Sequence, residues 1–155
     1  MSTKLKLMGV DVASIGDAFA TAAGAQEIVY DDPRQGLYKK LVVDADGTVA
    51  GGILVGDASA YGTLVHMARG DMPTPGHPEA LIFPDLGGGS ALSAVGIGAL
   101  SDTATICSCE NVSKGRLCAA IAEDACHDVP ALKAATRAGT GCGGCVPMLG
   151  DLLKD

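Results

Sequence analysis

The sequence predicts an α+β protein in two parts: a small mixed α/β domain, built from a hairpin and a helix, and a small all-α domain. Short apolar, partly β-branched runs separated by turn residues occupy residues 1–70. The Pro-rich stretch 72–78 then interrupts any helix or interior strand, because Pro lacks an N–H donor and restricts the residue before it. Residues 104–155 instead show helical spacing with capping residues. We therefore expect domains at 1–70 and 104–155, joined by a Pro/Gly linker over 71–103.

In the first domain, four runs have strand character: 5–8, 27–30, 37–43 and 48–55. The last two flank Asp44-Ala45-Asp46-Gly47, whose Asp and Gly favour a tight reversal, so the sequence predicts a β-hairpin there. Asp57 or Ser59 is suited to cap a following helix that runs to about Arg69.

In the last third, Ser113 is suited to cap a helix over 114–124. Asp128 followed by Pro130 marks a second helix start, and Gly139 is expected to end that helix. A third helix is expected just after Cys145. About fifty residues is marginal for an unaided hydrophobic core, so a bound metal would supply missing stability.

Composition excludes several classes of function. The formal charge of −7 disfavours binding to nucleic acid, and the chain has no Trp to stack on bases. No apolar stretch is long enough for a membrane span, and the N-terminus lacks a secretory signal, so we expect a cytoplasmic protein. The Gly87-Gly88-Gly89 run has no phosphate-loop or dinucleotide-binding pattern around it.

All six cysteines lie after residue 106, which is unlike a disulfide framework spread through a chain. In a reducing compartment such cysteines are metal ligands or catalytic groups. They include two close pairs, Cys107-Ser108-Cys109 and Cys142-Gly143-Gly144-Cys145, each expected at a loop-to-helix junction where backbone N–H groups offset thiolate charge. The pairs predict a metal centre.

Four thiolates suit either Zn²⁺ or an iron–sulfur cluster, although the Cys-x-Cys spacing is less typical of zinc. We favour a [2Fe-2S] cluster, whose reduced form would be stabilised by N–H groups pointing at sulfur. The residues expected to line it in this way are Ser108, Gly141, Gly143 and Gly144. Cys118, Cys126 and His127 are not expected to be ligands.

The motifs Ile106-Cys107-Ser108-Cys109-Glu110-Asn111-Val112-Ser113 and Ala138-Gly139-Thr140-Gly141-Cys142-Gly143-Gly144-Cys145 resemble the bacterioferritin-associated ferredoxin-like domain. That family has a Cys-x-Cys pair, a helical hairpin and a Cys-x-x-Cys pair. The resemblance implies that Cys107, Cys109, Cys142 and Cys145 ligate a [2Fe-2S] cluster.

The segments 8–17, 38–43 and 52–57 resemble the C-terminal domain of FAD-dependent reductases of the NADH–rubredoxin reductase type. The two domains in this order are similar to the large subunits of NAD(P)H-dependent assimilatory nitrite reductases. The resemblance implies an internal fragment of such a subunit, with FAD and with sirohaem and [4Fe-4S] in neighbouring domains, and a possible small subunit as partner. The fragment alone is then not catalytic; it relays electrons from FAD toward sirohaem during the reduction of nitrite to ammonia.

Three alternatives stay open: the electron-transfer part of an assimilatory nitrate reductase, a free-standing iron-delivery ferredoxin, and a zinc-stabilised interaction module. Other polar residues indicate no site. His66 and His77 stand alone, Asp11, Asp17, Asp31 and Asp32 fit no calcium-binding loop, and Ser14 and Ser59 lack a nucleophile motif.

Overall fold

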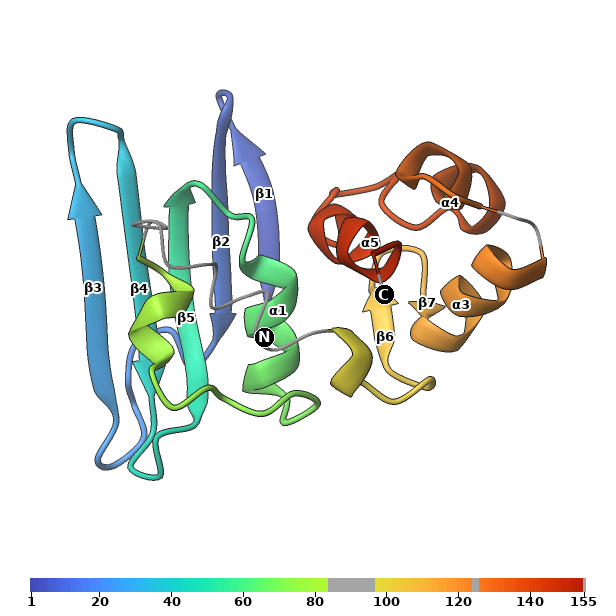
Figure 1. Ribbon diagram of the computed structural model, residues 1–155. Coiled ribbons are helices and arrows are strands. Elements are labelled where there is room, and N and C mark those ends of the chain that lie inside the picture. Colours follow the sequence, from blue (N-terminus) through green and yellow to red (C-terminus); the bar gives the residue numbers. More distant parts are fainter. Residues whose placement is uncertain (84–96, 124–125, 155) are drawn as a thin grey trace. The chain divides into compact units, whose positions relative to one another are not determined.

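The computed structural model of the chain describes residues 1–83, 97–123 and 126–154 (Figure 1). The chain forms two compact units, Met1–Val95 and Gly96–Asp155. The division falls inside the predicted connection over 71–103, while the Gly87–Gly89 run lies outside the described residues. Among the described helices, none is long and apolar enough to cross a membrane.

The first unit contains a five-stranded antiparallel sheet in the order β1-β2-β5-β4-β3. Its strands are β1 (Thr3–Leu7), β2 (Val10–Gly16), β3 (Gln26–Asp32), β4 (Leu37–Val43) and β5 (Val49–Gly56). The predicted β4–β5 hairpin is confirmed, and Asp44 Oδ1 shapes its turn by accepting the N–H groups of Asp46 and Thr48. Strand β2 was not predicted, because Ala, Ser and Gly give it a weak strand signal.

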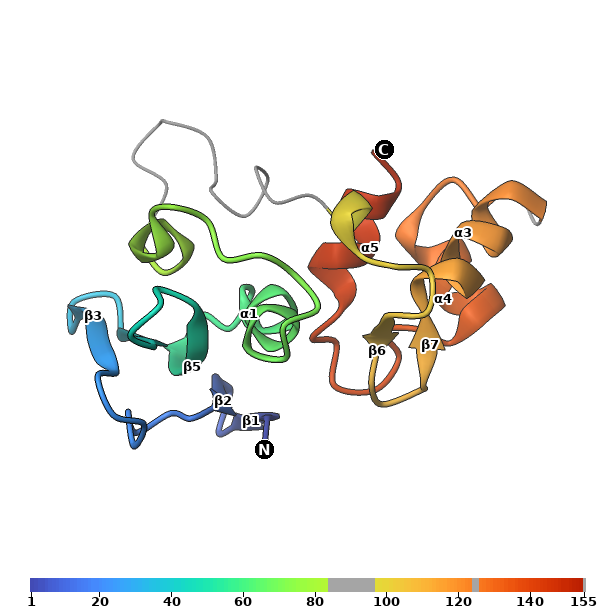
Figure 2. The same cartoon turned by 90° about the horizontal axis from the view of Figure 1, so that it is seen from below.

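Helix α1 (Tyr61–Ala68) and the short 3₁₀ helix η1 (Pro78–Leu81) lie on the same side of this sheet (Figure 2). The core-forming side chains are fully buried aliphatic residues of the sheet and of α1, namely Ile15, Leu41, Leu54, Leu64 and Met67. Phe83, just after η1, packs edge-on against Tyr30 of β3 with 5.7 Å between the ring centroids. Residues 78–83 therefore pack with the first unit, although the sequence placed them in the connection.

Two neighbouring lysines of β4 are almost buried, and each has a carboxylate partner. Lys39 Nζ lies 2.7 Å from Asp57 Oδ2, and Lys40 Nζ lies 2.7 Å from Glu27 Oε1. The sequence suggested Asp57 or Ser59 as the cap of α1, but neither residue caps it. The residue before α1 is Ala60, which makes no side-chain capping bond. The carboxylate instead compensates a buried ammonium group.

Partial burial by itself raises the pKa of Asp57, but the hydrogen bonds from Lys39 and from the backbone and hydroxyl of Ser59 outweigh it. The pKa of Asp57 consequently lies below its ordinary value.

The isolated polar residues have structural roles in the first unit. His66 is 2% exposed, and its Nδ1 lies 3.2 Å from Asp71 Oδ2. Asp17 Oδ2 accepts the backbone N–H groups of Thr21 and Ala22, which fixes the loop after β2.

In its described residues, the second unit combines a 3₁₀ helix and three short α-helices with a two-stranded ribbon: η2 (Ile97–Ala99), β6 (Thr105–Cys107), β7 (Val112–Ser113), α3 (Lys114–Glu123), α4 (Val129–Thr136) and α5 (Val146–Leu152). The predicted helices are confirmed, including the Ser113 cap on Arg116 N and the Asp128 cap on Ala131 N. The β6–β7 ribbon is an addition to the expected all-α domain, and its strands are too short to produce a sequence period. The α+β class is confirmed.

Helix α4 ends two residues earlier than its glycine suggested. Arg137, rather than Gly139, takes the left-handed conformation at the C-cap, with φ +64° and ψ 0°. Gly139 also has a positive φ, of +76°, and continues the turn toward the second cysteine pair.

Candidate metal centre

The first cysteine pair lies in the turn of the β6–β7 ribbon. Ile106 and Val112 anchor the ribbon, since both side chains are buried. Cys107 ends β6 and is 3% exposed, whereas Cys109 in the turn is exposed. This placement corrects the expected loop-to-helix junction, because β7 stands between this pair and α3.

The second pair lies between α4 and α5, at the predicted loop-to-helix junction. Cys145 directly precedes α5 and is 6% exposed, while Cys142 is exposed. Gly143 has φ +71°, a conformation that other residues rarely adopt. The turn allows Gly144 N–H to donate to Cys142 Sγ, at 3.4 Å.

The fold brings the two pairs together. The Sγ atoms of Cys109 and Cys142 lie 3.3 Å apart, although the residues are 33 positions apart in the chain. Cys107 and Cys145 form a second thiol–thiol hydrogen bond on the buried side. Each contact therefore joins one sulfur from each loop.

Glycine allows the loops to approach this closely. A Cβ atom at Gly141 would lie 3.2 Å from Cys109 Cβ and 3.7 Å from Cys109 Sγ. A Cβ atom at Gly139 would lie 3.0 Å from a methyl group of Val146 and 3.8 Å from Cys145 Sγ. A side chain at Gly141 would push the second loop away from Cys109, whereas a side chain at Gly139 would crowd Val146 at the start of α5.

The thiol environment favours a bound cation. Burial, followed by the proximity of Cys107 and Cys142, raises the pKa of Cys145 to about 12. Adjacent thiols resist ionisation because their thiolates repel one another, and a metal reverses this by providing positive charge. Four convergent cysteine sulfurs, a Gly-lined approach and a backbone donor form a donor set that fits a [2Fe-2S] cluster.

The described part of the chain contains no group of three or more His, Cys, Asp or Glu side chains arranged for a single metal ion. The four sulfur atoms are arranged as the two contacts described above. Ser108, expected to line the site, lies exposed in the ribbon turn.

Neither of the two remaining cysteines takes part in the two sulfur contacts described above. Cys118 is half-buried on α3, and Cys126 is buried before α4. His127 is exposed.

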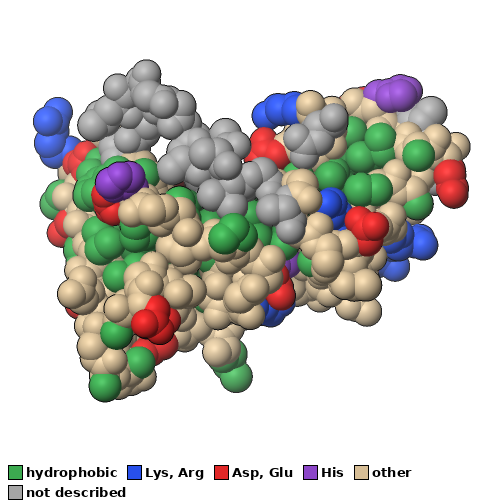
Figure 3. All heavy atoms as spheres, turned by 60° about the horizontal axis from the view of Figure 1, so that its bottom comes forward, with side chains coloured by type: hydrophobic (Ala, Val, Ile, Leu, Met, Phe, Trp, Pro, Cys, Tyr) green, Lys and Arg blue, Asp and Glu red, His purple; other side chains and the backbone are tan. Residues whose placement is uncertain are grey.

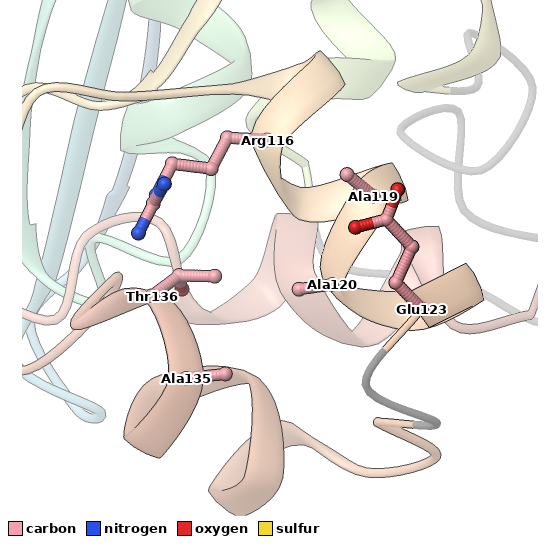
Figure 4. Close-up of a pocket in the computed structure, with 6 residues that line it drawn as sticks. All are labelled: Arg116, Ala119, Ala120, Glu123, Ala135 and Thr136. Atoms are coloured by element: carbon pink, nitrogen blue, oxygen red, sulfur yellow. The ribbon is translucent and has the colours of Figure 1, made fainter.

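A pocket of about 110 Å³ lies between α3 and α4 (Figure 4). Arg116 and Glu123 come from α3, and Thr136 from α4, with three alanines completing the lining. None of the four cysteines lines this pocket, so it is separate from the candidate metal centre.

One pair of residues beside the cysteines was missed from sequence. Glu110 follows Cys109 directly, and its Oε2 lies 3.4 Å from Nε of Arg137, at the end of α4. The available signal was a pair of opposite charges, one directly after Cys109 and the other five residues before Cys142.

Comparisons with known proteins support both predicted domains. Residues 105–155 match the family model of the BFD-like [2Fe-2S] binding domain. Residues 2–67 match that of the Rubredoxin NAD+ reductase C-terminal domain. The two matches agree with the predicted domain types and with their predicted order.

Curated relatives extend the similarity to nearly the whole chain. It is 50% identical over 155 residues to the nitrite reductase [NAD(P)H] large subunit of Klebsiella oxytoca, covering 99% of the chain. It is 47% identical over 155 residues to the nitrite reductase (NADH) large subunit of Escherichia coli (strain K12). The chain spans only 16% and 18% of these two relatives, so each of them contains further domains.

A more distant relative has a different name. The chain is 30% identical over 153 residues to the assimilatory nitrate reductase electron transfer subunit of Bacillus subtilis (strain 168), of which it covers 19%. No solved structure matches the chain.

Proposed function

We propose that Cys107, Cys109, Cys142 and Cys145 hold a [2Fe-2S] cluster and that the chain transfers single electrons. The observation that carries this proposal is the convergence of four thiols from two distant loops, with 3.3 Å between Cys109 Sγ and Cys142 Sγ. The match of residues 105–155 to a [2Fe-2S] binding domain supports iron rather than zinc. When bound, the cluster supplies a carrier for one electron at a time.

The chain's own residues have distinct tasks in this proposal. Cys107 and Cys145 are buried, so the protein excludes water from that side of the site. Cys109 and Cys142 are exposed and leave the other side open to an electron donor or acceptor. Gly144 N–H donates to Cys142 Sγ, and such donation stabilises negative charge on sulfur.

We further propose that the chain acts within NAD(P)H-dependent reduction of nitrite to ammonia. In this role it receives electrons from a flavin domain and passes them toward a domain with sirohaem and [4Fe-4S], both in the longer protein. A small subunit is a further candidate partner, and a cytoplasmic location suits thiols that must stay reduced. The 50% and 47% identities to nitrite reductase large subunits support this assignment.

A chimaeric enzyme tests the proposed function. The segment of the Escherichia coli large subunit that aligns with this chain is replaced by the chain, and NADH-dependent nitrite reduction is measured. We expect the chimaera to be active and its Cys107→Ser version to lose activity, with flavin content unchanged. An active chimaera that keeps its rate after Cys107→Ser would refute the relay role.

The similarity to an assimilatory nitrate reductase electron transfer subunit favours one second candidate. In that case the chain passes electrons toward a nitrate-reducing centre. The same chimaeric design in the Bacillus subtilis relative distinguishes the two candidate functions. Both need the same four cysteines, but the centre that accepts the electrons reduces nitrite in one case and nitrate in the other.

A further inference from the structure

The C-cap of α4 contains an arginine in a conformation that favours glycine. Arg137 has φ +64° and ψ 0°, and a non-glycine residue in this left-handed region costs about 1–2 kcal/mol. A sequence under no other constraint would place Gly or Asn here. We therefore expect the side chain of Arg137 to have a role that offsets this cost.

The backbone of Arg137 organises the start of the second cysteine loop. Its N–H donates to Lys133 O, which closes α4, and its own carbonyl accepts both the N–H and the hydroxyl of Thr140. Two residues later the chain reaches Cys142. The turn at Arg137 thus sets the direction in which the loop leaves the helix.

The side chain of Arg137 connects this loop to the first one. Its Nε lies 3.4 Å from Glu110 Oε2, and Glu110 directly follows Cys109. The Sγ atoms of Cys109 and Cys142, which lie 3.3 Å apart, belong to the same two loops: Cys109 directly precedes Glu110, and Cys142 follows Arg137 by five residues. An ion pair at this position spans the same two loops as the sulfur contact on the exposed side of the site.

We propose that Arg137 is a positioning residue for the metal centre: through Glu110 it holds the two cysteine loops together and balances negative charge beside the sulfur atoms. This inference rests on the proposed function for its charge effect, whereas the tether is an ion pair between two side chains of the chain itself. Exposed ion pairs contribute little to global stability, so the effect is local to the loops.

The charge effect has a definite sign. Replacing Arg137 by Gln leaves the Glu110 carboxylate unbalanced near a cluster that becomes more negative on reduction, and this disfavours the reduced form. Replacing Glu110 by Gln has the opposite effect. We expect each change to alter the equilibrium for one-electron reduction by about two- to fivefold, in opposite directions, and the double variant to lie near the wild type.

The closing experiment compares Arg137→Gln, Arg137→Lys, Arg137→Gly and Glu110→Gln. Lys154→Gln is the matched control, since it removes a basic residue from an exposed ion pair with Asp151 at the far end of α5. On loaded protein, potentiometric titration at low and high salt should show a lower potential for Arg137→Gln and Arg137→Gly, a smaller change for Arg137→Lys, a higher potential for Glu110→Gln, and no change for the control.

A second measurement uses the metal-free chain. Diamide oxidises Cys109 and Cys142 to a disulfide, taking up the two electrons and two protons that the thiols lose, and peptide mapping gives the rate of this linkage. We expect Arg137→Gln and Arg137→Gly to slow it several-fold and the Lys154→Gln control to leave it unchanged.

The Gly variant separates side chain from backbone, because it relieves the strain at φ +64° while removing the tether. Unchanged linkage rates and unchanged potentials in the Gln and Gly variants overturn the proposal. A wild-type chain that takes up no iron but shows the expected linkage rates contradicts the proposed function alone.

Discussion

The two units of the chain reach stability by different means. The sheet unit buries large aliphatic side chains from several strands and from α1, among them Ile15, Leu41, Leu54 and Leu64. The C-terminal unit has one fully buried leucine on each of α3, α4 and α5, namely Leu117, Leu132 and Leu149, and it also buries two of the four cysteines, Cys107 and Cys145. A thiol core gains stability when it binds metal, whereas an aliphatic core does not. From this difference we expect metal binding to be coupled to folding in the C-terminal unit alone.

The two units also differ in how the charge of buried groups is neutralised. In the sheet unit the almost buried Lys39 and Lys40 are neutralised by Asp57 and Glu27 within the fold itself. In the C-terminal unit the charge of ionised thiols requires an added cation. On the face shown in Figure 3, the described basic and acidic side chains are interspersed rather than separated by sign.

The largest expected effect follows from removing a sulfur ligand. Cys107→Ser should abolish cluster binding and loosen the C-terminal unit, because the buried thiol contact with Cys145 is lost together with the metal. Hydrogen exchange resolved by peptide should rise across α3 to α5 and stay unchanged across β1 to β5. Equal loss of protection in both units would contradict the comparison.

The reverse perturbation should act on the sheet unit. Leu54 is fully buried, and Leu54→Ala should reduce the free energy of unfolding of this unit by about 2–5 kcal/mol. Iron content per chain should remain at the wild-type value. Denaturant unfolding followed by far-ultraviolet circular dichroism measures the free energy of unfolding. A lower iron content in Leu54→Ala than in the wild type at low denaturant would show that the units are not independent.

A glycine substitution sharpens the comparison within the C-terminal unit. Gly141→Ala places a Cβ atom 3.2 Å from Cys109 Cβ, so we expect lower iron occupancy and faster loss of iron to a chelator. Gly150→Ala is the control: it meets no atom within 4 Å and should stabilise α5 by about 0.5–1 kcal/mol. Equal chelator kinetics in the two variants would argue against a close-packed sulfur site.

A pH-dependent effect is expected in the sheet unit. The pKa of Asp57 is lowered in the folded state, so its stabilisation is present above the unfolded pKa near 3.8 and is lost as the pH falls through the lower folded value. Asp57→Asn should therefore be less stable than wild type at neutral pH, with the difference shrinking below about pH 4. A difference in unfolding free energy that persists undiminished at the lowest pH would exclude this pair as its source.

The smallest effect is expected from the other cysteines. Cys118→Ser and Cys126→Ser should keep the full iron content and the same spectrum, since neither residue takes part in the two sulfur contacts. Iron and labile sulfide analysis checks this. Loss of the cluster in either variant would mean that the ligand set has been assigned incorrectly.

Sequence patterns predicted the features that depend on short-range chemistry. The Ser113 and Asp128 caps, the hairpin turn at Asp44–Gly47 and the spacing of the cysteine pairs are all encoded within a few residues. The contact between Cys109 and Cys142 could be expected from the family resemblance, since it joins two such motifs across a helical hairpin.

Features set by tertiary contacts could not be predicted in the same way. Asp57 has the composition of a helix cap, but the buried Lys39 ammonium from another strand takes its carboxylate. Arg137 takes the C-cap conformation expected of Gly139, and its ion-pair partner Glu110 lies 27 residues earlier in the chain, beyond the reach of a local pattern. The β6–β7 ribbon is too short for periodicity to reveal it.

The central claim, that Cys107, Cys109, Cys142 and Cys145 hold two irons, is tested most directly by metal analysis of the chain purified without oxygen. We expect two irons and two labile sulfides per chain, and an electron paramagnetic resonance signal that integrates to one spin after one-electron reduction. A colourless chain with one zinc ion per molecule and no such signal would contradict it.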